Sequence, residues 1–363
     1  MARLGLGPFW RIAFANDHDP KKIDAYARAF GADEVLRAGD VWSIAPAELP
    51  GRADLAWASF PCQDLSLAGA RAGLDAPRSG AFWGFWRLIE ALVRERRAPT
   101  ILVLENVVGL LTSRNGADFR ALAGVLAGAG YGFGALEIDA AHFVPQSRPR
   151  VFVVASRTAP PASLRGGEAA TPFHGDGVIA AHAQLAPDIA RRWIWWRLPA
   201  PPLRNTALTD IVDDGASVWH TRTQTDALLA MMSSRQRDKV AALQRAHAPA
   251  VGALFRRVRV EDGRKVQRAE VRFDGLAGCL RTPAGGSSRQ IVLFVDGASV
   301  RSRLLTAREG ARLMGLPDTY PLPSSESQGL KIVGDGVAVP AVRWLSAHLL
   351  EPLARAGAAR RAA

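Results

Sequence analysis

The chain has 363 residues, 48% of them hydrophobic, which is enough to bury the core of one large domain and a smaller one. No run of about 18 apolar residues occurs, so we expect no membrane span, and two cysteines are too few for a disulfide framework or a zinc site. The formal net charge is +12, with the excess in the second half, which predicts a surface for a polyanion. A GC-rich genome is the alternative explanation of so many arginines.

The first 157 residues alternate between predicted strands and helices. A strand is predicted at Arg11–Ala15. Asp19 then predicts a helix N-cap, with Pro20 in the first helical position and Gly31 after the last turn. Further strands are predicted near 53–60, 100–105, 133–139 and 150–156, with helices near 80–97 and 115–129. This alternation predicts an α/β protein with a parallel, doubly wound sheet.

From about residue 158 the pattern becomes irregular, because proline and glycine pairs interrupt it. Thr306 and Glu309 have the spacing of a capping box, which predicts a helix ended by Gly315. A last amphipathic helix is predicted from near Pro340 towards Leu353, followed by a frayed tail over 355–363.

Three short motifs stand beside predicted strands. Pro61-Cys62-Gln63 follows the apolar run 55–58, Glu105-Asn106-Val107 ends the next strand, and Gln146-Ser147-Arg148-Pro149-Arg150 leads into a third. A thiol at the mouth of a sheet can have a lowered pKa and act as a nucleophile. A nucleophile, an acid and two arginines suit an electrophile that is both attacked and protonated.

At these residues the chain resembles the DNA (cytosine-5) methyltransferase family, whose catalytic motifs they match in order and spacing. The segments 306–318 and 334–340 resemble the family's last two blocks. The resemblance implies a class I S-adenosylmethionine-dependent methyltransferase with a Rossmann-like doubly wound sheet. It also implies three parts: a catalytic and cofactor-binding domain over 1–158, a smaller irregular target-recognition domain over 159–300, and a returning segment over 301–363.

The resemblance gives each motif residue a role in transferring a methyl group to carbon 5 of cytosine. Cys62 attacks carbon 6, Glu105 donates to ring nitrogen 3, and Arg150 contacts the carbonyl oxygen. Arg148 is expected near the thiolate and a phosphate, and Asn106 is expected to hold the loop of Glu105. Without the resemblance, Cys62 could be an inert buried thiol and Glu105 an ordinary carboxylate at a strand end. Arg148 and Arg150 could then lie on a strand edge that faces the solvent. Cys279 has no partner motif and is interpreted as structural.

The implied methyl donor is S-adenosylmethionine. Asp17, at the end of the first predicted strand, matches the acidic residue of the family that binds the ribose hydroxyls of the cofactor. Asp335 stands where the family commonly has Asn, so it either repels the cofactor's carboxylate or binds its ammonium group. The cofactor-binding residues that the resemblance implies are Asp17, His18, Asp40, Val41, Pro61, Asp335 and Val337.

The implied partner is duplex DNA, from which the target base must be flipped out. The loop 64–80 is expected to close over the DNA. The residues predicted to contact DNA are Gln63, Ser66, Arg78, Arg256, Arg257 and Arg259. Trp193, Trp195 and Trp196, flanked by arginines, either help to read the DNA or form the core of the small domain.

One family block has no counterpart. The family opens with a strand and a Gly-rich turn, Phe-x-Gly-x-Gly, whereas Met1–Pro8 resembles the helix that follows this turn. A start site placed too far downstream and an inactive remnant are two explanations, and either predicts weak or no activity. Two other functions therefore stay open: a non-catalytic DNA-binding remnant, and a tRNA cytosine-5 methyltransferase.

We expect a bacterial cytoplasmic, nucleoid-associated monomer without a metal or membrane anchor. A cognate restriction endonuclease encoded nearby is the other expected partner.

Overall fold

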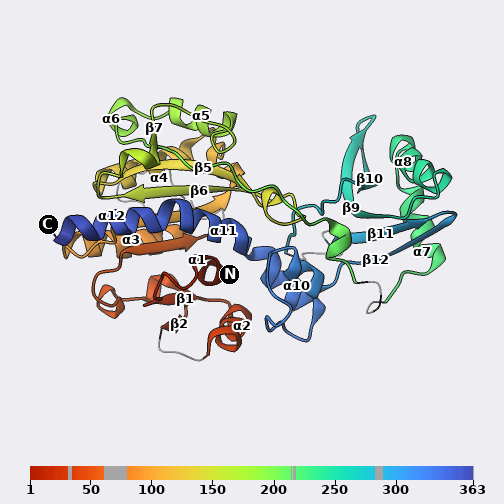
Figure 1. The fold of residues 1–363 in the computed structure, drawn as a ribbon, viewed down its shortest axis with the longest axis horizontal. Coiled ribbons are helices and arrows are strands. Elements are labelled where there is room, and N and C mark those ends of the chain that lie inside the picture. The colour runs from red at the N-terminus through yellow and green to blue at the C-terminus, as the bar shows by residue number, and fades with distance from the viewer. Residues whose placement is uncertain (32–34, 61–79, 214, 216–217, 283–288, 363) are drawn as a thin grey trace. The chain divides into compact units, whose positions relative to one another are not determined.

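The computed structural model describes residues 1–31, 35–60, 80–213, 215, 218–282 and 289–362 (Figure 1). The chain divides into two compact units. Unit 1 comprises Met1–Gly5, Ala140–Arg148 and Pro201–Val342. Unit 2 comprises Leu6–Asp139, Pro149–Ala200 and Arg343–Ala363.

Unit 2 contains the main sheet, with strand order β3-β4-β6-β5. Its strands are β3 (Leu55–Ser59), β4 (Ile101–Val107), β5 (Gly132–Asp139) and β6 (Pro149–Ser156). β3 and β4 are parallel, whereas β6 is antiparallel to both of its neighbours. The α/β class is confirmed, but the sheet is mixed rather than wholly parallel. The short connection 140–148 between β5 and β6 cannot hold the crossover that a parallel pair requires.

Two helices cover the sheet of unit 2: α3 (Ala81–Arg94) and α4 (Ala117–Gly128). Their apolar faces meet strand residues that are fully buried, because the interiors of β4 and β6 consist mostly of apolar side chains. The core includes Phe82 and Trp86 from α3, Phe119 and Leu122 from α4, and Leu102, Leu104, Val151 and Val153 from the strands.

A second, two-stranded sheet of unit 2 pairs β1 (Ala15–Asp17) with β2 (Leu36–Ala38) in parallel. Between them lies α2 (Pro20–Phe30), whose predicted cap at Asp19 and end at Gly31 are confirmed. The strand predicted at Arg11–Ala15 is wrong except at Ala15, since the short β2 is the only described strand that pairs there. Among the described residues, no strand pairs with the outer edge of β1 or of β3.

The segment 160–200 also lies in unit 2 and forms β7 (Arg165–Gly166), α5 (Asp176–Ala183), α6 (Pro187–Ala190) and β8 (Trp195–Trp196). Trp196 is 1% exposed and donates a hydrogen bond to the carbonyl of Val154. Trp193 and Trp195 pack against the same core. These tryptophans therefore pack in a core, as one of the two interpretations expected, but the core is that of unit 2.

Both ends of the chain are helical. α1 (Ala2–Leu6) begins the chain. At the other end, α11 (Val339–Leu345) continues through a π-turn over Ser346–Leu350 into α12 (Glu351–Ala362). The frayed tail predicted over 355–363 is thus wrong up to Ala362, because alanine and arginine favour the helix.

Unit 1 contains a four-stranded antiparallel sheet of order β10-β9-β11-β12. Its strands are β9 (Ala250–Glu261), β10 (Arg264–Arg272), β11 (Ile291–Asp296) and β12 (Ser299–Leu304). The helices α7 (Arg222–Ala230) and α8 (Ser234–Arg245) share its core. The unit also holds α9 (Ala307–Arg312), whose predicted capping box and end at Gly315 are confirmed, and α10 (Glu326–Asp335).

Candidate active site

The ends of β3 and β4 bring together the first two sequence motifs. Ser59, the last residue of β3, pairs with Glu105 near the end of β4. Cys62 follows Ser59 by three residues in the sequence. The predicted site residues Pro61, Cys62, Gln63, Ser66 and Arg78 lie outside the described residues. The described strand end that leads towards Cys62 is therefore next to Glu105.

Asn106 joins these two strand ends. It is 4% exposed, its Nδ2 donates to the carbonyl of Phe60 at 2.9 Å, and its Oδ1 accepts from the backbone N–H of Val107 at 2.8 Å. Phe60 itself is 7% exposed and packs in the core. Asn106 thus fixes the carbonyl of Phe60, the last described backbone group before Pro61. We had expected Asn106 to hold the loop that carries Glu105, so the observed contact is a different one.

Glu105 and Arg150 form a buried ion pair in unit 2. Arg150 Nε lies 3.3 Å from Glu105 Oε1, and the side chains are 13% and 9% exposed. The register explains their proximity: Arg150 pairs with Val107, two residues beyond Glu105 on the same face of β4. A guanidinium beside the carboxylate offsets part of the cost of burying it. The pair offers a planar ligand one carboxyl group and one cationic donor in a site that excludes most water.

Arg148, in unit 1, has a different environment. It is 2% exposed, and Nη1 donates to the carbonyl of Leu280 at 2.8 Å, while Nη2 donates to the carbonyls of Gly334 at 2.8 Å and Gly336 at 2.6 Å. These bonds tie the third motif to the block at 334–340. They indicate a positioning role, and its predicted place beside a thiolate and a phosphate stays a prediction.

Gln146 is a site residue for which the sequence analysis predicted no contact and no function. It is fully buried, its Nε2 donates to the carbonyl of Leu313 at 2.8 Å, and its Oε1 accepts from the N–H of Leu280 at 3.0 Å. Its place in the motif was the only sequence signal. Cys279 is part-buried next to this region, and its Sγ lies 3.4 Å from Arg148 Nη1. These contacts support the structural interpretation of Cys279.

Four predicted cofactor residues lie in unit 2, at the carboxyl ends of β1 and β2, where parallel strands commonly bind ligands. Asp17 has a side chain that is 36% exposed, and its Oδ1 accepts from the N–H of Asp19 at 2.9 Å. Its remaining acceptor positions suit a pair of hydroxyl donors, so Asp17 fits a ribose. His18 is 81% exposed and free to stack on a flat ring.

Asp40 and Val41 follow β2. The carboxylate of Asp40 accepts from the N–H of Trp42 at 3.0 Å and so caps the short 3₁₀ helix Val41–Ser43. This cap is a structural role that competes with cofactor binding. A Cβ placed on Gly84 would lie 2.6 Å from Val41 Cγ1, which shows that Val41 packs tightly against α3.

The other predicted cofactor residues that the structure describes lie in unit 1. Asp335 accepts a hydrogen bond from the hydroxyl of Thr282, and Val337 is 5% exposed. The hydroxyl of Thr282 therefore orients the carboxylate of Asp335.

The predicted DNA-binding arginines of unit 1 lie on β9. Arg257 and Arg259 are about half exposed and lie 3.9 and 2.5 Å from the carboxylate of Glu270. Arg256 points to the opposite face of the strand and is only partly exposed.

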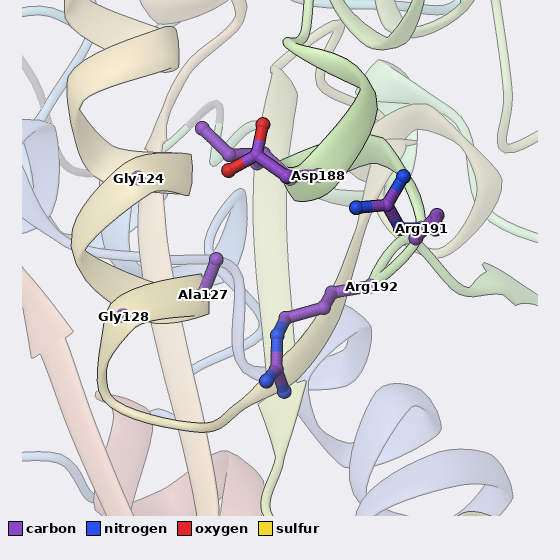
Figure 2. A pocket seen from close by; sticks show the side chains of 7 residues that line it. Gly124, Ala127, Gly128, Asp188, Arg191 and Arg192 are labelled. Atoms are coloured by element: carbon purple, nitrogen blue, oxygen red, sulfur yellow. The ribbon is translucent and has the colours of Figure 1, made fainter.

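A pocket of about 590 Å³ lies elsewhere in unit 2, between α4 and the segment 188–192. Figure 2 shows Asp188, Arg191 and Arg192 around it, with Gly124 and Gly128 on α4. β5 starts beside this pocket, and Gly132 and Ile101 both pair with Ser156. This end of the sheet is opposite to Glu105, so the pocket is separate from the motif residues.

Within the described residues, no group of three or more His, Cys, Asp or Glu side chains could hold a metal ion. None of the described helices is long and apolar enough to cross a membrane.

The comparisons agree over nearly the whole chain. Residues 3–351 match the model of the family described as C-5 cytosine-specific DNA methylase. The type II methyltransferase M.HpaII of Haemophilus parainfluenzae is 25% identical over 378 residues, covering 96% of this chain and 88% of the relative. M.MspI of a Moraxella species is 23% identical over 340 residues, and the match spans 93% of this chain but 65% of that relative.

The solved structure of the Dnmt2 methyltransferase of S. pombe shares the fold, with a TM-score of 0.56 and 18% identity over 94% of this chain and 91% of that chain. DNMT2 of Spodoptera frugiperda has a TM-score of 0.57 at 16% identity, over 97% and 95% of the two chains. These two structures show the fold, and the family match over residues 3–351 shows that the chain belongs to the C-5 cytosine-specific DNA methylases.

Proposed function

We propose that this protein transfers a methyl group from S-adenosylmethionine to carbon 5 of a flipped-out cytosine in duplex DNA. The observation that carries the proposal is the buried pair of Glu105 and Arg150 at the end of β4, beside the strand end that leads to Cys62. The family description, C-5 cytosine-specific DNA methylase, supports DNA as the substrate, and the relatives' names as type II methyltransferases support a restriction-modification setting.

In this mechanism the Cys62 thiolate forms a bond to carbon 6, and the electron pair of the 5,6 double bond makes carbon 5 nucleophilic. Glu105 donates a proton or hydrogen bond at nitrogen 3, and Arg150 stabilises the charge that develops on the carbonyl oxygen. S-adenosylmethionine supplies an electrophilic methyl group when it is bound. A solvent base then takes the proton from carbon 5, Cys62 leaves carbon 6 as a thiolate, and the proton on nitrogen 3 returns to Glu105, which restores the aromatic ring.

For the cofactor, Asp17 would accept the ribose hydroxyls and His18 would stack on the adenine, while Asp40 and Val41 would meet its edge. Pro61, Asp335 and Val337 would complete the site. On the DNA, Gln63, Ser66 and Arg78 would stabilise the flipped base, and Arg256, Arg257 and Arg259 would contact the duplex. The domain boundaries at 158 and 300, a monomeric state, a cognate endonuclease and a place at the bacterial nucleoid are part of this proposal.

Covalent trapping tests it. Duplex DNA containing 5-fluorocytosine is incubated with S-adenosylmethionine and either the protein or its Cys62→Ser variant, and the adduct is measured by denaturing gel and mass spectrometry. Fluorine blocks the final release, so the wild type should accumulate an adduct and the variant none. A tRNA containing the same base serves as the competing substrate.

An adduct with tRNA alone would replace duplex DNA by RNA as the substrate. No adduct with either nucleic acid, from a protein that still binds DNA, would leave the DNA-binding remnant as the function. An adduct that survives the Cys62→Ser change would contradict the assigned nucleophile.

A further inference from the structure

The hairpin of β9 and β10 extends beyond the sheet of unit 1. β9 pairs with β11 only over Ala250–Leu254, whereas it pairs with β10 as far as Glu261. Residues 255–270 therefore form a two-stranded ribbon with no third described strand beside it. Figure 1 shows this part of β9 and β10 turning away from β11 and β12. Ala269, at the base of the ribbon, is buried against Met232, whereas Val258, Val260, Lys265 and Gln267 nearer the turn are exposed.

One face of the ribbon, which we call the valine face, carries side chains without ion pairs. Val258 pairs across the ribbon with Gln267, and Val260 pairs with Lys265, so these four side chains share a face. Val258 is 61% exposed and Val260 is 70% exposed. Gln267 and Lys265 are also exposed.

The opposite face is partly neutralised within the ribbon, because its four arginines lie beside two glutamates. Glu270 lies beside Arg257 and Arg259, and Glu261 forms an ion pair with Arg268. Such exposed pairs contribute little stability but reduce the free charge of this face. The valine face is thus the one with unused hydrogen-bonding groups and apolar contacts.

The composition of the ribbon selects the kind of partner. Residues 255–270 hold six Lys and Arg against three Asp and Glu, which favours a polyanion. A two-stranded β-ribbon has the width to enter the major groove of B-DNA. There, an amide side chain such as Gln267 can form two hydrogen bonds with adenine, and the methyl groups of valine can pack against the methyl group of thymine.

We propose that the ribbon enters the major groove with Val258, Val260, Lys265 and Gln267 towards the base edges and so determines which sequence is recognised. This inference rests on the proposed function, since it takes duplex DNA as the substrate. It assigns sequence reading to the face opposite Arg257 and Arg259, towards the turn from the partly buried Arg256, and leaves Arg257 and Arg259 to contact phosphates.

Binding to DNA tests the ribbon independently of catalysis. The full-length protein selects from a pool of duplexes with a randomised central segment, the bound DNA is sequenced, and affinity for the selected duplex is measured by fluorescence anisotropy. Gln267→Ala should change the selected base at one or two positions and weaken binding to the original duplex by about tenfold to a hundredfold. Lys265→Gln should weaken binding and lower its salt dependence.

The matched control is Lys239→Gln, which removes the same charge from an exposed position of α8 in the same unit. It should leave the selected sequence unchanged. Melting temperatures of all variants should stay near that of the wild type, because the replaced side chains are exposed.

The inference would be overturned if the wild type did not bind duplex DNA, or if Gln267→Ala selected the same sequence as the wild type. It would also be overturned if the protein formed a dimer that Val258→Asp abolishes, because the valine face would then bind a second copy. Adduct trapping separates the two proposals. Sequence-selective binding through the ribbon without a Cys62 adduct would refute the proposed function alone. An adduct with unchanged selectivity in Gln267→Ala would refute this inference alone.

Discussion

At the scale of single residues, the site depends on polar side chains buried at strand ends. Glu105 and Asn106 are consecutive residues of β4 and point to opposite faces. Glu105 meets Arg150, whereas Asn106 meets the carbonyl of Phe60. One tripeptide thus supplies both a reacting group and the bond that fixes the neighbouring strand end.

Removing that bond should affect catalysis more than binding. In Asn106→Ala the carbonyl of Phe60 loses a buried donor, which costs about 1–3 kcal/mol. If half of that cost, about 0.5–1.5 kcal/mol, raises the barrier to attack by Cys62, the rate of methyl transfer falls by roughly twofold to tenfold. Single-turnover rates at saturating DNA and cofactor measure the effect, beside the melting temperature.

Asn106→Asp is the discriminating variant. It keeps the acceptor for the N–H of Val107 but cannot donate to Phe60 when ionised. Both variants should therefore lose rate. A fast Asn106→Asp protein would show that the bond to Val107, and not the one to Phe60, positions the site.

At the scale of secondary-structure elements, a buried ion pair connects β12 to the start of α9. Arg303 donates to both carboxylate oxygens of Glu309, at 2.9 and 2.6 Å, and the side chains are 0% and 1% exposed. The same carboxylate caps α9 through the N–H of Thr306 and accepts from the N–H of Asp213. Both oxygens of the buried Glu309 carboxylate accept hydrogen bonds, whereas Arg303 Nε has no hydrogen-bond partner among the described residues. Removing the carboxylate would leave the Arg303 guanidinium buried without its counter-charge, which is costly.

The pair predicts a pH dependence of stability. Burial alone would raise the pKa of Glu309, but Arg303 and the backbone donors of Thr306 and Asp213 outweigh burial, so the pKa lies below its ordinary value. The folded pKa is thus lower than the unfolded one, about 4.3. The stabilisation is complete above that pH and is lost as the pH falls through the folded value.

Glu309→Gln should therefore destabilise the protein by about 3–5 kcal/mol at pH 7 and by less as the pH falls below 4. Thermal unfolding by calorimetry between pH 3 and pH 7 measures this difference. His174 and His182 of unit 2 provide the comparison, because burial lowers the pKa of each. Their effect on stability appears as the pH falls below about 6.5 and should be the same in both proteins. A constant gap between wild type and variant at every pH would contradict the prediction.

At the scale of the whole molecule, the sheets of unit 2 leave two strand edges without a described partner. β1 pairs only with β2, and β3 pairs only with β4, among the residues that the structure describes. Unpaired backbone groups in a strand are costly unless water or another strand satisfies them. Asp17 and the strand end leading to Cys62 are therefore not joined through one continuous ladder.

The sequence by itself determined the features that depend on neighbouring residues. The cap of α2 at Asp19, the capping box of α9 and the positions of β3 to β6 follow from signals within a few residues of each element. The three motifs likewise stand beside the strands that their apolar runs predicted. Local periodicity and capping need no knowledge of the rest of the chain.

Only the tertiary structure decided which segments meet. The antiparallel direction of β6 places Arg150 beside Glu105, and the burial of Trp196 against Val154 moves the 160–200 segment into unit 2. The early end of the β9–β11 pairing leaves the ribbon free, with Val258 and Gln267 on one face. Strand direction, register and burial depend on residues far apart in the chain, and a local pattern does not contain them.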